Sequence, residues 1–514
     1  MSRLMVERRF LAEYARTPVN LLALVVVPAV FVVVVTGPLS RAAEVLGAPD
    51  PSGVATVSAG WTAGFLTGIA MYFHIATTRA ADRALVIAGM RPWRVVTARL
   101  ATGAALAVVG SLAALLALGS RDLSSVTARA IVGTFLFAAV YLGIGAVAGA
   151  VAPDPVNGTA TILVIWILDA FFGPVLSDSG QRVTRVLPTH DISVWMAQLP
   201  VGHISSGRAL ALGAGWALTA LVAAVAVLCL RVRQHGARAS QSRSGGLIVQ
   251  VRAATLAAVR ASRRDPVLWV LLAVVPAVFV VFAQLTTPHS PTSVTVTDAG
   301  VTGPRLFDVF DIHAGTMTPI AVASLAALAG VFALVDSRAG DARLVVAGMG
   351  VTAALAARVA VLLAAATLAT GVTLAVSAPF FHAAQWPWYA ISVLLIALTY
   401  ALVGALAAPL VGRVAAVLLA FLVPFLDLGI GQSPMLGGQP PGWAQWLPSY
   451  PAYRLLIDAG LSQRFDSTQE LLAASGWLVM LATALILVSR AGFKPARRGR
   501  GRMSLEPARD HAHT

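Results

Sequence analysis

The chain has 514 residues, of which 58% are hydrophobic and only 11% are charged. A soluble chain of this length would divide into several domains and carry roughly 25% charged residues, so the composition excludes that class. Apolar runs of about twenty residues recur along the sequence, and each can cross a hydrocarbon core of about 30 Å. The runs lack the polar–apolar alternation of outer-membrane β-barrels. We therefore expect an all-α polytopic membrane protein.

In chain order, the sequence first predicts a six-span unit over residues 1–230. It opens with an amphipathic stretch, 3–16, that we expect to lie in the membrane surface as a helix. Its spans are expected near 19–37, 60–77, 95–119, 128–152, 158–177 and 209–230. An Arg- and Ser-rich cytoplasmic linker, 231–246, follows the sixth span.

A second six-span unit is predicted over residues 247–492 and again opens with an interfacial stretch, 247–264. Its spans are expected near 267–285, 317–335, 351–378, 388–411, 413–430 and 471–490, which makes twelve in all. The basic tail, 493–514, is expected to be disordered and cytoplasmic.

The basic residues indicate the orientation of these spans. The net charge is +15, but Lys494 is the only lysine among 37 basic residues, and the arginines lie mainly in short loops between apolar runs. This is typical of charge that sets topology, with anionic lipid as the counterion, and it does not predict a nucleic-acid partner. The predicted topology puts 28 of the 37 on one side, so both termini are expected in the cytoplasm.

The two units repeat one another in sequence. Val26–Val33 and Val274–Val281 are both VVPAVFVV. Further matches, in the same order, pair Tyr141 with Tyr400, Asp169 with Asp427, Leu187-Pro188 with Leu447-Pro448, and Gly215-Trp216 with Gly476-Trp477. Because six is an even number, the two units should share one orientation as parallel repeats, with a pathway between them.

A charged cassette lies between the second and third spans of each unit: Thr78–Met90 is TRAADRALVIAGM and Ser337–Met349 is SRAGDARLVVAGM. A loop that only sets topology needs charge but not a repeated apolar hexamer. We therefore expect a short helix that docks into a cytoplasmic partner, although a solvated loop is the simpler alternative. If the first cassette is helical, Asp82 is within reach of Arg79. The expected docking residues are Arg79, Asp82, Arg83, Leu85 and Arg91, with Arg338, Asp341, Arg343 and Leu344 in the second cassette.

Four further residues inside the spans are candidates for a pathway or gate. Asp169 and Asp427 occupy equivalent places near the outer ends of the fifth and eleventh spans. They could form a cation site, a proton relay or a substrate contact, or they could reach interfacial water or cap the following segment. Pro28 and Pro276 lie in the first span of each unit and should kink both at the same depth.

The sequence contains no residues for catalysis by this chain. It has no Gly-x-x-x-x-Gly-Lys-Ser/Thr phosphate loop, and its single Cys229 excludes a disulfide framework and a cysteine-based metal site. We expect no cofactor, no metal and no ATP hydrolysis by this chain, so an energy source must come from elsewhere.

These features together resemble the permease of ABC transporters of the type-2 exporter class. The resemblance implies interfacial elbow helices at 3–16 and 247–264, and coupling helices at Arg79–Arg94 and Arg338–Gly350. It also implies short outer helices within 178–208 and 431–470, both of which contain a Leu-Pro pair. The family's usual acidic-Arg-Gly start of the coupling loop is here Arg-Ala-Ala-Asp-Arg and Arg-Ala-Gly-Asp-Ala-Arg.

Two fused units rich in Ala, Val and Arg resemble the exporters of polyketide-type antibiotics in high-GC actinobacteria. The resemblance implies a bacterial cell membrane, a separate ATP-binding subunit in two copies that carries ATP and Mg²⁺, and a hydrophobic or amphipathic small molecule as cargo.

Two other classes remain open from the sequence. A proton-coupled secondary transporter with six plus six spans also carries Asp-Arg in its repeated loops, as Asp82-Arg83 does here. The cassette loop of about twenty residues and the long outer loops disfavour this class, because its loop is a tight turn. A membrane scaffold that does not transport is the third class.

Overall fold

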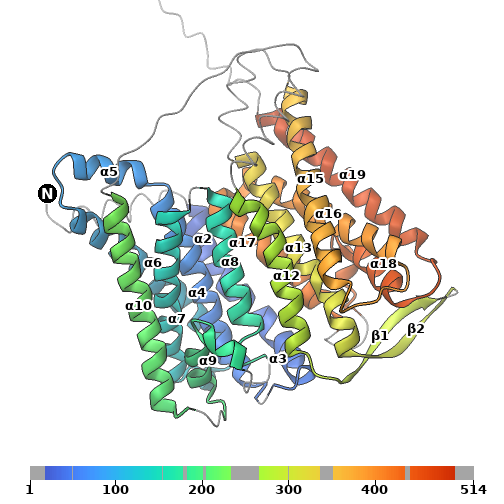
Figure 1. The fold of residues 1–514 in the computed structure, drawn as a ribbon, viewed down its shortest axis with the longest axis horizontal. Helices are drawn as coiled ribbons and strands as arrows, with labels where there is room; N and C mark the ends of the chain where they lie inside the picture. Colours follow the sequence, from blue (N-terminus) through green and yellow to red (C-terminus); the bar gives the residue numbers. More distant parts are fainter. Residues whose placement is uncertain are drawn as a thin grey trace, which may run out of the picture.

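The structure is a computed structural model, shown as a ribbon in Figure 1. It describes residues 18–48, 50–152, 154–176, 182–200, 204–232, 266–298, 300–335, 351–434 and 440–492. The predicted interfacial stretches, most of the linker, the coupling segment Arg338–Gly350 and the tail lie outside these residues. Four predicted docking residues therefore lie outside them too: Arg338, Asp341, Arg343 and Leu344.

The first half of the described chain is helical. Its elements are α2 (Pro18–Val30), η1 (Phe31–Val35), α3 (Thr36–Val45), α4 (Gly53–Ala76), α5 (Arg79–Ile87), α6 (Pro92–Arg121), η2 (Leu123–Ser125), α7 (Ala128–Val151), α8 (Pro155–Phe171), η3 (Arg182–Val186), α9 (His190–Ala197) and α10 (Ser206–Val232). The segment η1 is a π-helix that joins α2 to α3 without a break.

The second half contains helices and one pair of strands. Its elements are α12 (Pro266–Thr286), β1 (Pro291–Asp298), β2 (Val301–Asp308), α13 (Val309–Val335), α15 (Val351–Ser377), α16 (Trp386–Val411), α17 (Arg413–Pro424), η4 (Phe425–Gly431), η6 (Ala444–Trp446), α18 (Tyr450–Leu461) and α19 (Thr468–Gly492). The segment η4 is a second π-helix, which continues α17.

Ten helices within the described residues are long and apolar enough to cross a membrane. They are the α2–α3 segment, α4, α6, α7, α10, α13, α15, α16, α17 with η4, and α19. The shorter apolar helices Pro155–Phe171 and Ala273–Leu285 lie where the fifth and seventh spans were predicted. The expected multi-pass helical membrane protein is confirmed, because apolar helices satisfy their backbone hydrogen bonds within lipid.

Helices α4 and α13 are the buried centre of the bundle. Helix α4 packs along α7, and α13 packs along α16. A Cβ on Gly145 of α7 would collide with the Gly68 carbonyl of α4, and a Cβ on Gly404 of α16 would collide with the Ala327 carbonyl of α13. Glycine at these positions lets the two backbones touch, as is common where helices pack in membranes.

An antiparallel hairpin, β1–β2, is the element that an all-α prediction missed. Its strands pair from Pro291 with Asp308 to Asp298 with Val301. The hairpin lies at the end of the bundle opposite α5 (Figure 1). Next to it, the Ser290 hydroxyl donates a 3.3 Å hydrogen bond to the Val45 carbonyl at the end of α3. The hairpin region therefore joins the first half of the chain to the second at this end.

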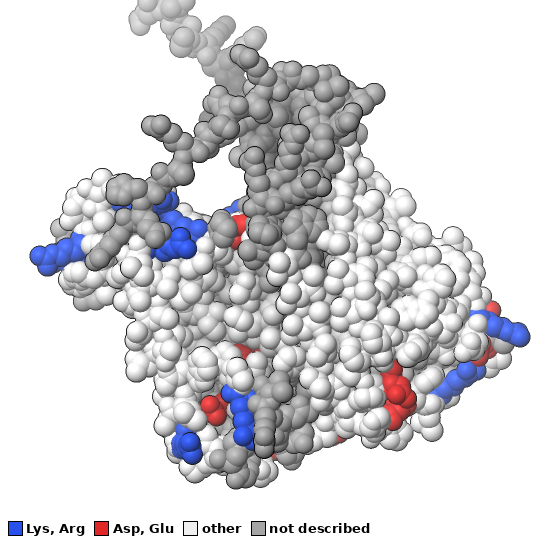
Figure 2. Space-filling model, viewed as in Figure 1, with Lys and Arg blue, Asp and Glu red and all other residues white. Residues whose placement is uncertain are grey.

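On one face of the molecule, charged side chains lie mainly at its two ends. On the face shown in Figure 2, Lys, Arg, Asp and Glu gather around α5 at one end and around the hairpin and loops at the other. The band between them is almost entirely uncharged. A band of this kind is what the hydrocarbon core of a bilayer requires, because a charged side chain there is costly.

Candidate functional site

Helix α5 is the short helix predicted between the second and third spans. It runs from Arg79 to Ile87, and a turn with Gly89 at φ +93° follows it. Helix α6 then begins at Pro92, a residue that suits the first turn of a helix because it lacks an N–H group. The cassette thus forms a small helix that lies against the end of the bundle (Figure 1).

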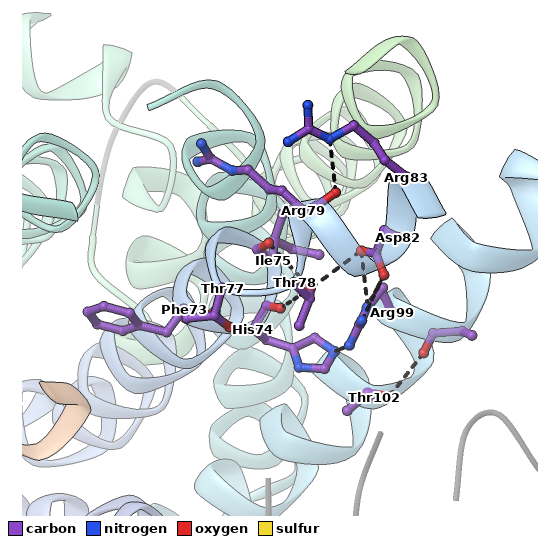
Figure 3. A network of polar contacts seen from close by, with 11 residues as sticks. Phe73, His74, Ile75, Thr77, Thr78, Arg79, Asp82, Arg83, Arg99 and Thr102 are labelled. Carbon is purple, nitrogen blue, oxygen red and sulfur yellow. Dashed lines mark hydrogen bonds and ion pairs between the residues drawn. The ribbon is translucent and has the colours of Figure 1, made fainter. Parts of the chain in front are cut away.

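The inner face of α5 carries a buried ion pair. Asp82 is 5% exposed, and Arg99 of α6 binds both of its carboxylate oxygens, with Nη2 2.7 Å from Oδ1 and Nε 3.1 and 3.2 Å from Oδ1 and Oδ2. Arg99 Nη1 also lies 3.4 Å from Nε2 of His74 in α4 (Figure 3). The spacing predicted Arg79 as the partner of Asp82, but Arg99 takes this place. A two-point guanidinium–carboxylate contact of this kind fixes orientation as well as distance.

Arg79 instead holds the end of α7. Its Nε donates to the Gly149 carbonyl at 2.7 Å, and its Nη2 donates to the Ala152 carbonyl at 2.6 Å. The last carbonyls of a helix have no hydrogen-bond donor within the helix and carry partial negative charge. A guanidinium group donates hydrogen bonds to them and also balances this charge. Arg83 Nε donates at 3.1 Å to the carbonyl of Arg79. Arg79 and Asp82 therefore fasten α5 to the bundle rather than reach out from it.

The opposite face of the cassette is open. Ile87 is 85% exposed and Trp93 is 47% exposed, while Leu85 is half-buried. We call the exposed residues the α5 outer surface: Ile87, Ala88, Gly89, Arg91, Trp93 and Arg94. The Arg94 guanidinium stands 5.6 Å from the Trp93 ring. Of the five residues predicted here for docking, Arg91 belongs to this surface. The sequence analysis did not select Ile87 or Trp93. Ile87 belongs to the repeated apolar hexamer of the cassette, and Trp93 follows the cassette at the start of α6.

The two membrane aspartates each bind a tyrosine. Tyr141 of α7 donates a 2.6 Å hydrogen bond to Asp169 of α8, and Tyr400 of α16 donates one of 2.5 Å to Asp427 of η4. The Ser449 hydroxyl, just before α18, donates to Asp427 at 2.5 Å, and the Gln432 amide donates to it as well. Both aspartates are at most 2% exposed, so they do not reach interfacial water as one interpretation expected.

Thr189 lies beside Asp169 at the start of α9, as Ser449 lies beside Asp427 at the start of α18. Short helices were predicted within 178–208 and 431–470, and α9 and α18 are present there. Each aspartate therefore connects its own helix and that of its tyrosine with the short helix that follows.

Aromatic side chains close the contact between the two halves. Phe421 of α17 lies with its ring centre 4.6 Å from that of Trp166 in α8 and 5.5 Å from that of Phe65 in α4. Phe425 stacks on Phe31 at 6.0 Å. A cavity of about 70 Å³ lies beside them, lined by residues of α3, α8, α12, α13, α17 and η4. The halves therefore meet through packed aromatic rings.

The two predicted kink residues lie inside the first helix of each half. Pro28 is buried in α2, which passes into the π-helix η1 three residues later. Pro276 is buried in α12, which stays α-helical from Pro266 to Thr286. A π-turn interrupts the regular hydrogen bonding of a helix and is frequent at functional sites.

Comparison of the sequence with protein-family models and with curated proteins finds no match. Within the described part of the chain, no three His, Cys, Asp or Glu side chains are grouped so that they could hold a metal ion.

Proposed function

We propose that this protein is the membrane-spanning permease of an ABC exporter of the type-2 class, driven by a separate ATP-binding subunit. The observation that carries the proposal is the construction of α5. Its inner face is fastened to the bundle by Arg79 and Asp82, and Ile87 at its end is exposed together with Trp93 at the start of α6. A helix built in this way can receive force from a partner and pass it on.

The attachments of α5 define where such a force would go. Asp82 binds α6 through Arg99, Arg79 binds the end of α7, and α4 leads directly into α5. A displacement of α5 would therefore move three helices together. Helix α4 contacts the second half through Phe65, so the movement would reach the aromatic contact with Phe421.

The pathway is proposed to lie between the two halves, as parallel repeats imply. The matched pairs Tyr141–Asp169 and Tyr400–Asp427, and the glycine contacts of α7 and α16, support an internal duplication of six spans each. The arginine distribution supports a cytoplasmic position for the α5 end. The cargo is a hydrophobic or amphipathic small molecule, and alternating access follows from partner states that bind the two conformations with different affinity.

The test is to co-express the full chain with a candidate ATP-binding subunit from its gene neighbourhood and to measure co-purification and ATP hydrolysis in lipid. Ile87→Asp should weaken both by about tenfold, because a charge replaces an exposed apolar contact residue at an interface. Leu123→Asp is the matched control, since Leu123 is 79% exposed at the opposite end of the bundle.

Two results would contradict the proposal. One is an equal effect of Ile87→Asp and Leu123→Asp on co-purification. The other is transport by the purified chain alone that follows a proton gradient and requires Asp169 and Asp427, which would establish the secondary-transporter class instead.

A further inference from the structure

A large apolar groove runs along the outside of the first half. Its volume is about 600 Å³, within the roughly 300–1,000 Å³ typical of small-molecule and cofactor sites. Helix α7 forms its floor through Gly143 and Val147, while α8 and α10 form its sides. Trp216 and Thr219 on the α10 side are exposed, so the groove opens outward from the bundle rather than into the contact between the halves.

The end of the groove nearest α5 is basic. Ala152 lines the groove, and its carbonyl accepts the 2.6 Å hydrogen bond from Arg79. Arg83, one turn further along α5, and Arg231, at the end of α10, both interact electrostatically with Arg79. In Figure 3 the guanidinium groups of Arg79 and Arg83 both point away from the buried Asp82–Arg99 pair.

Three arginines thus stand together where the groove reaches the charged end of the molecule. Burial, with a further contribution from the positive charges of Arg231 and Arg83, lowers the pKa of Arg79. Like charges held this close favour a bound anion.

We propose that the groove binds an anionic phospholipid, with an acyl chain along α7 and the phosphate beside Arg79, Arg83 and Arg231. An apolar channel that opens to lipid and ends in arginines at the membrane boundary matches an amphiphile with an anionic head group. Basic pockets of this kind between spans bind anionic lipid head groups. The site belongs to this chain whether or not an ATP-binding subunit drives it.

Among the described residues, the second half differs from the first at the position of the groove. The tyrosine pair Tyr141 and Tyr400 sets the alignment of α7 with α16, which places Leu402 at the position of Gly143 and Leu406 at that of Val147. Leu402 and Leu406 pack with Leu485 of α19. Larger side chains therefore occupy the second half where the groove of the first half has small ones.

Native mass spectrometry of the full chain, titrated with phosphatidylglycerol or phosphatidylcholine in neutral detergent, tests the proposal. Phosphatidylglycerol should bind more tightly than phosphatidylcholine. Arg231→Gln should weaken the binding of phosphatidylglycerol about fivefold. This is the change in affinity expected when one basic residue near an anionic membrane surface is lost. Arg208→Gln is the matched control, because Arg208 is exposed at the other end of the same helix.

A second variant fills the groove without touching the arginines. Thr161→Leu combined with Thr219→Met should reduce binding of phosphatidylglycerol, because larger side chains then take the place of the acyl chain. The proposal is overturned if the two lipids bind equally. It is also overturned if Arg231→Gln has no more effect than Arg208→Gln, or if the filled groove binds phosphatidylglycerol as the unchanged protein does.

Discussion

The hydroxyl of Tyr141 donates a 2.6 Å hydrogen bond to the carboxylate of Asp169, across from α7 to α8. The second half repeats the relationship with Tyr400 and Asp427. In both halves a neutral donor, not a cation, satisfies a carboxylate that lipid and protein shield from water. Buried polar groups cost free energy unless they are paired, so each pair should hold its two helices in one relative position.

Tyr141→Phe and Tyr400→Phe should each lower the free energy of unfolding by about 1–3 kcal/mol, because the buried carboxylate loses a donor. The measurement is thermal or denaturant unfolding of the full chain in detergent. Tyr450→Phe, which removes a half-buried hydroxyl at the start of α18, is the control and should change little. Unchanged stability in both buried variants would show that the aspartates do not depend on these tyrosines.

Asp82→Asn should destabilise the protein by about 3–5 kcal/mol, because it leaves Arg99 as a buried charge without its carboxylate. The double variant Asp82→Asn with Arg99→Gln should be less unstable than the single one, since no buried charge remains. Folded yield and unfolding temperature measure both effects. Glu44→Gln, at an exposed position, is the control, and a double variant as unstable as Asp82→Asn would exclude this account.

Phe421→Ala should open the contact between the halves, because its ring packs on both Phe65 and Trp166. Cysteine labelling can measure this, since Cys229 is the only cysteine and can be replaced by Ala. With Ile320→Cys as the reporter beside the 70 Å³ cavity, Phe421→Ala should speed labelling by a water-soluble maleimide. Phe135→Ala, in a separate cluster of the first half, should leave the rate unchanged. Equal rates in both variants would contradict the prediction.

The hairpin should lose its order only in acid. A hydrogen bond from Arg305 lowers the pKa of Asp298, and one from His289 lowers the pKa of Asp308. A carboxyl group with a lowered pKa stabilises the folded state fully above its ordinary pKa, about 3.9, and loses this effect as the pH falls through the folded value. The protection of the β1–β2 amides against hydrogen exchange, taken relative to the intrinsic exchange rate at each pH, should therefore stay constant from about pH 8 to 5 and fall below about pH 4.

Arg305→Gln is the matched variant for this experiment. It removes the main cause of the lowered pKa of Asp298, so the onset of the loss of protection should move to higher pH. An onset that stays in place would assign the acid sensitivity to other groups.

Hydropathy predicted the helical spans well because a span must be long and apolar throughout. Residue spacing within one helix did not predict contacts between side chains of different helices. The three-residue spacing placed Arg79 within reach of Asp82, whereas the partner of Asp82 is Arg99, seventeen residues away in α6. Sequence distance along one helix cannot show how two helices pack, so this pair could not be predicted.

Two other features, the tyrosine–aspartate pairs and the β-hairpin, are indicated by the sequence. Tyr141 and Asp169 recur together as Tyr400 and Asp427, and a tyrosine conserved between repeats beside a costly acid indicates a pair. The stretch Ser293–Asp298 alternates Thr with Val, and Gly300 follows close behind, which is typical of a strand and its turn. It lies in a short segment between two spans, where the apolar runs that indicate spans are absent.

The hydrogen bond from Ser290 to Val45 joins the two halves at the hairpin end of the bundle. The hairpin is fastened nearby, since Thr297 N–H donates to Asp458 at 2.9 Å and Gly300 N–H donates to Asp466 at 3.0 Å. Both hairpin bonds lie within the second half, so a relative movement of the two halves would strain the Ser290–Val45 contact and leave the hairpin bonds intact.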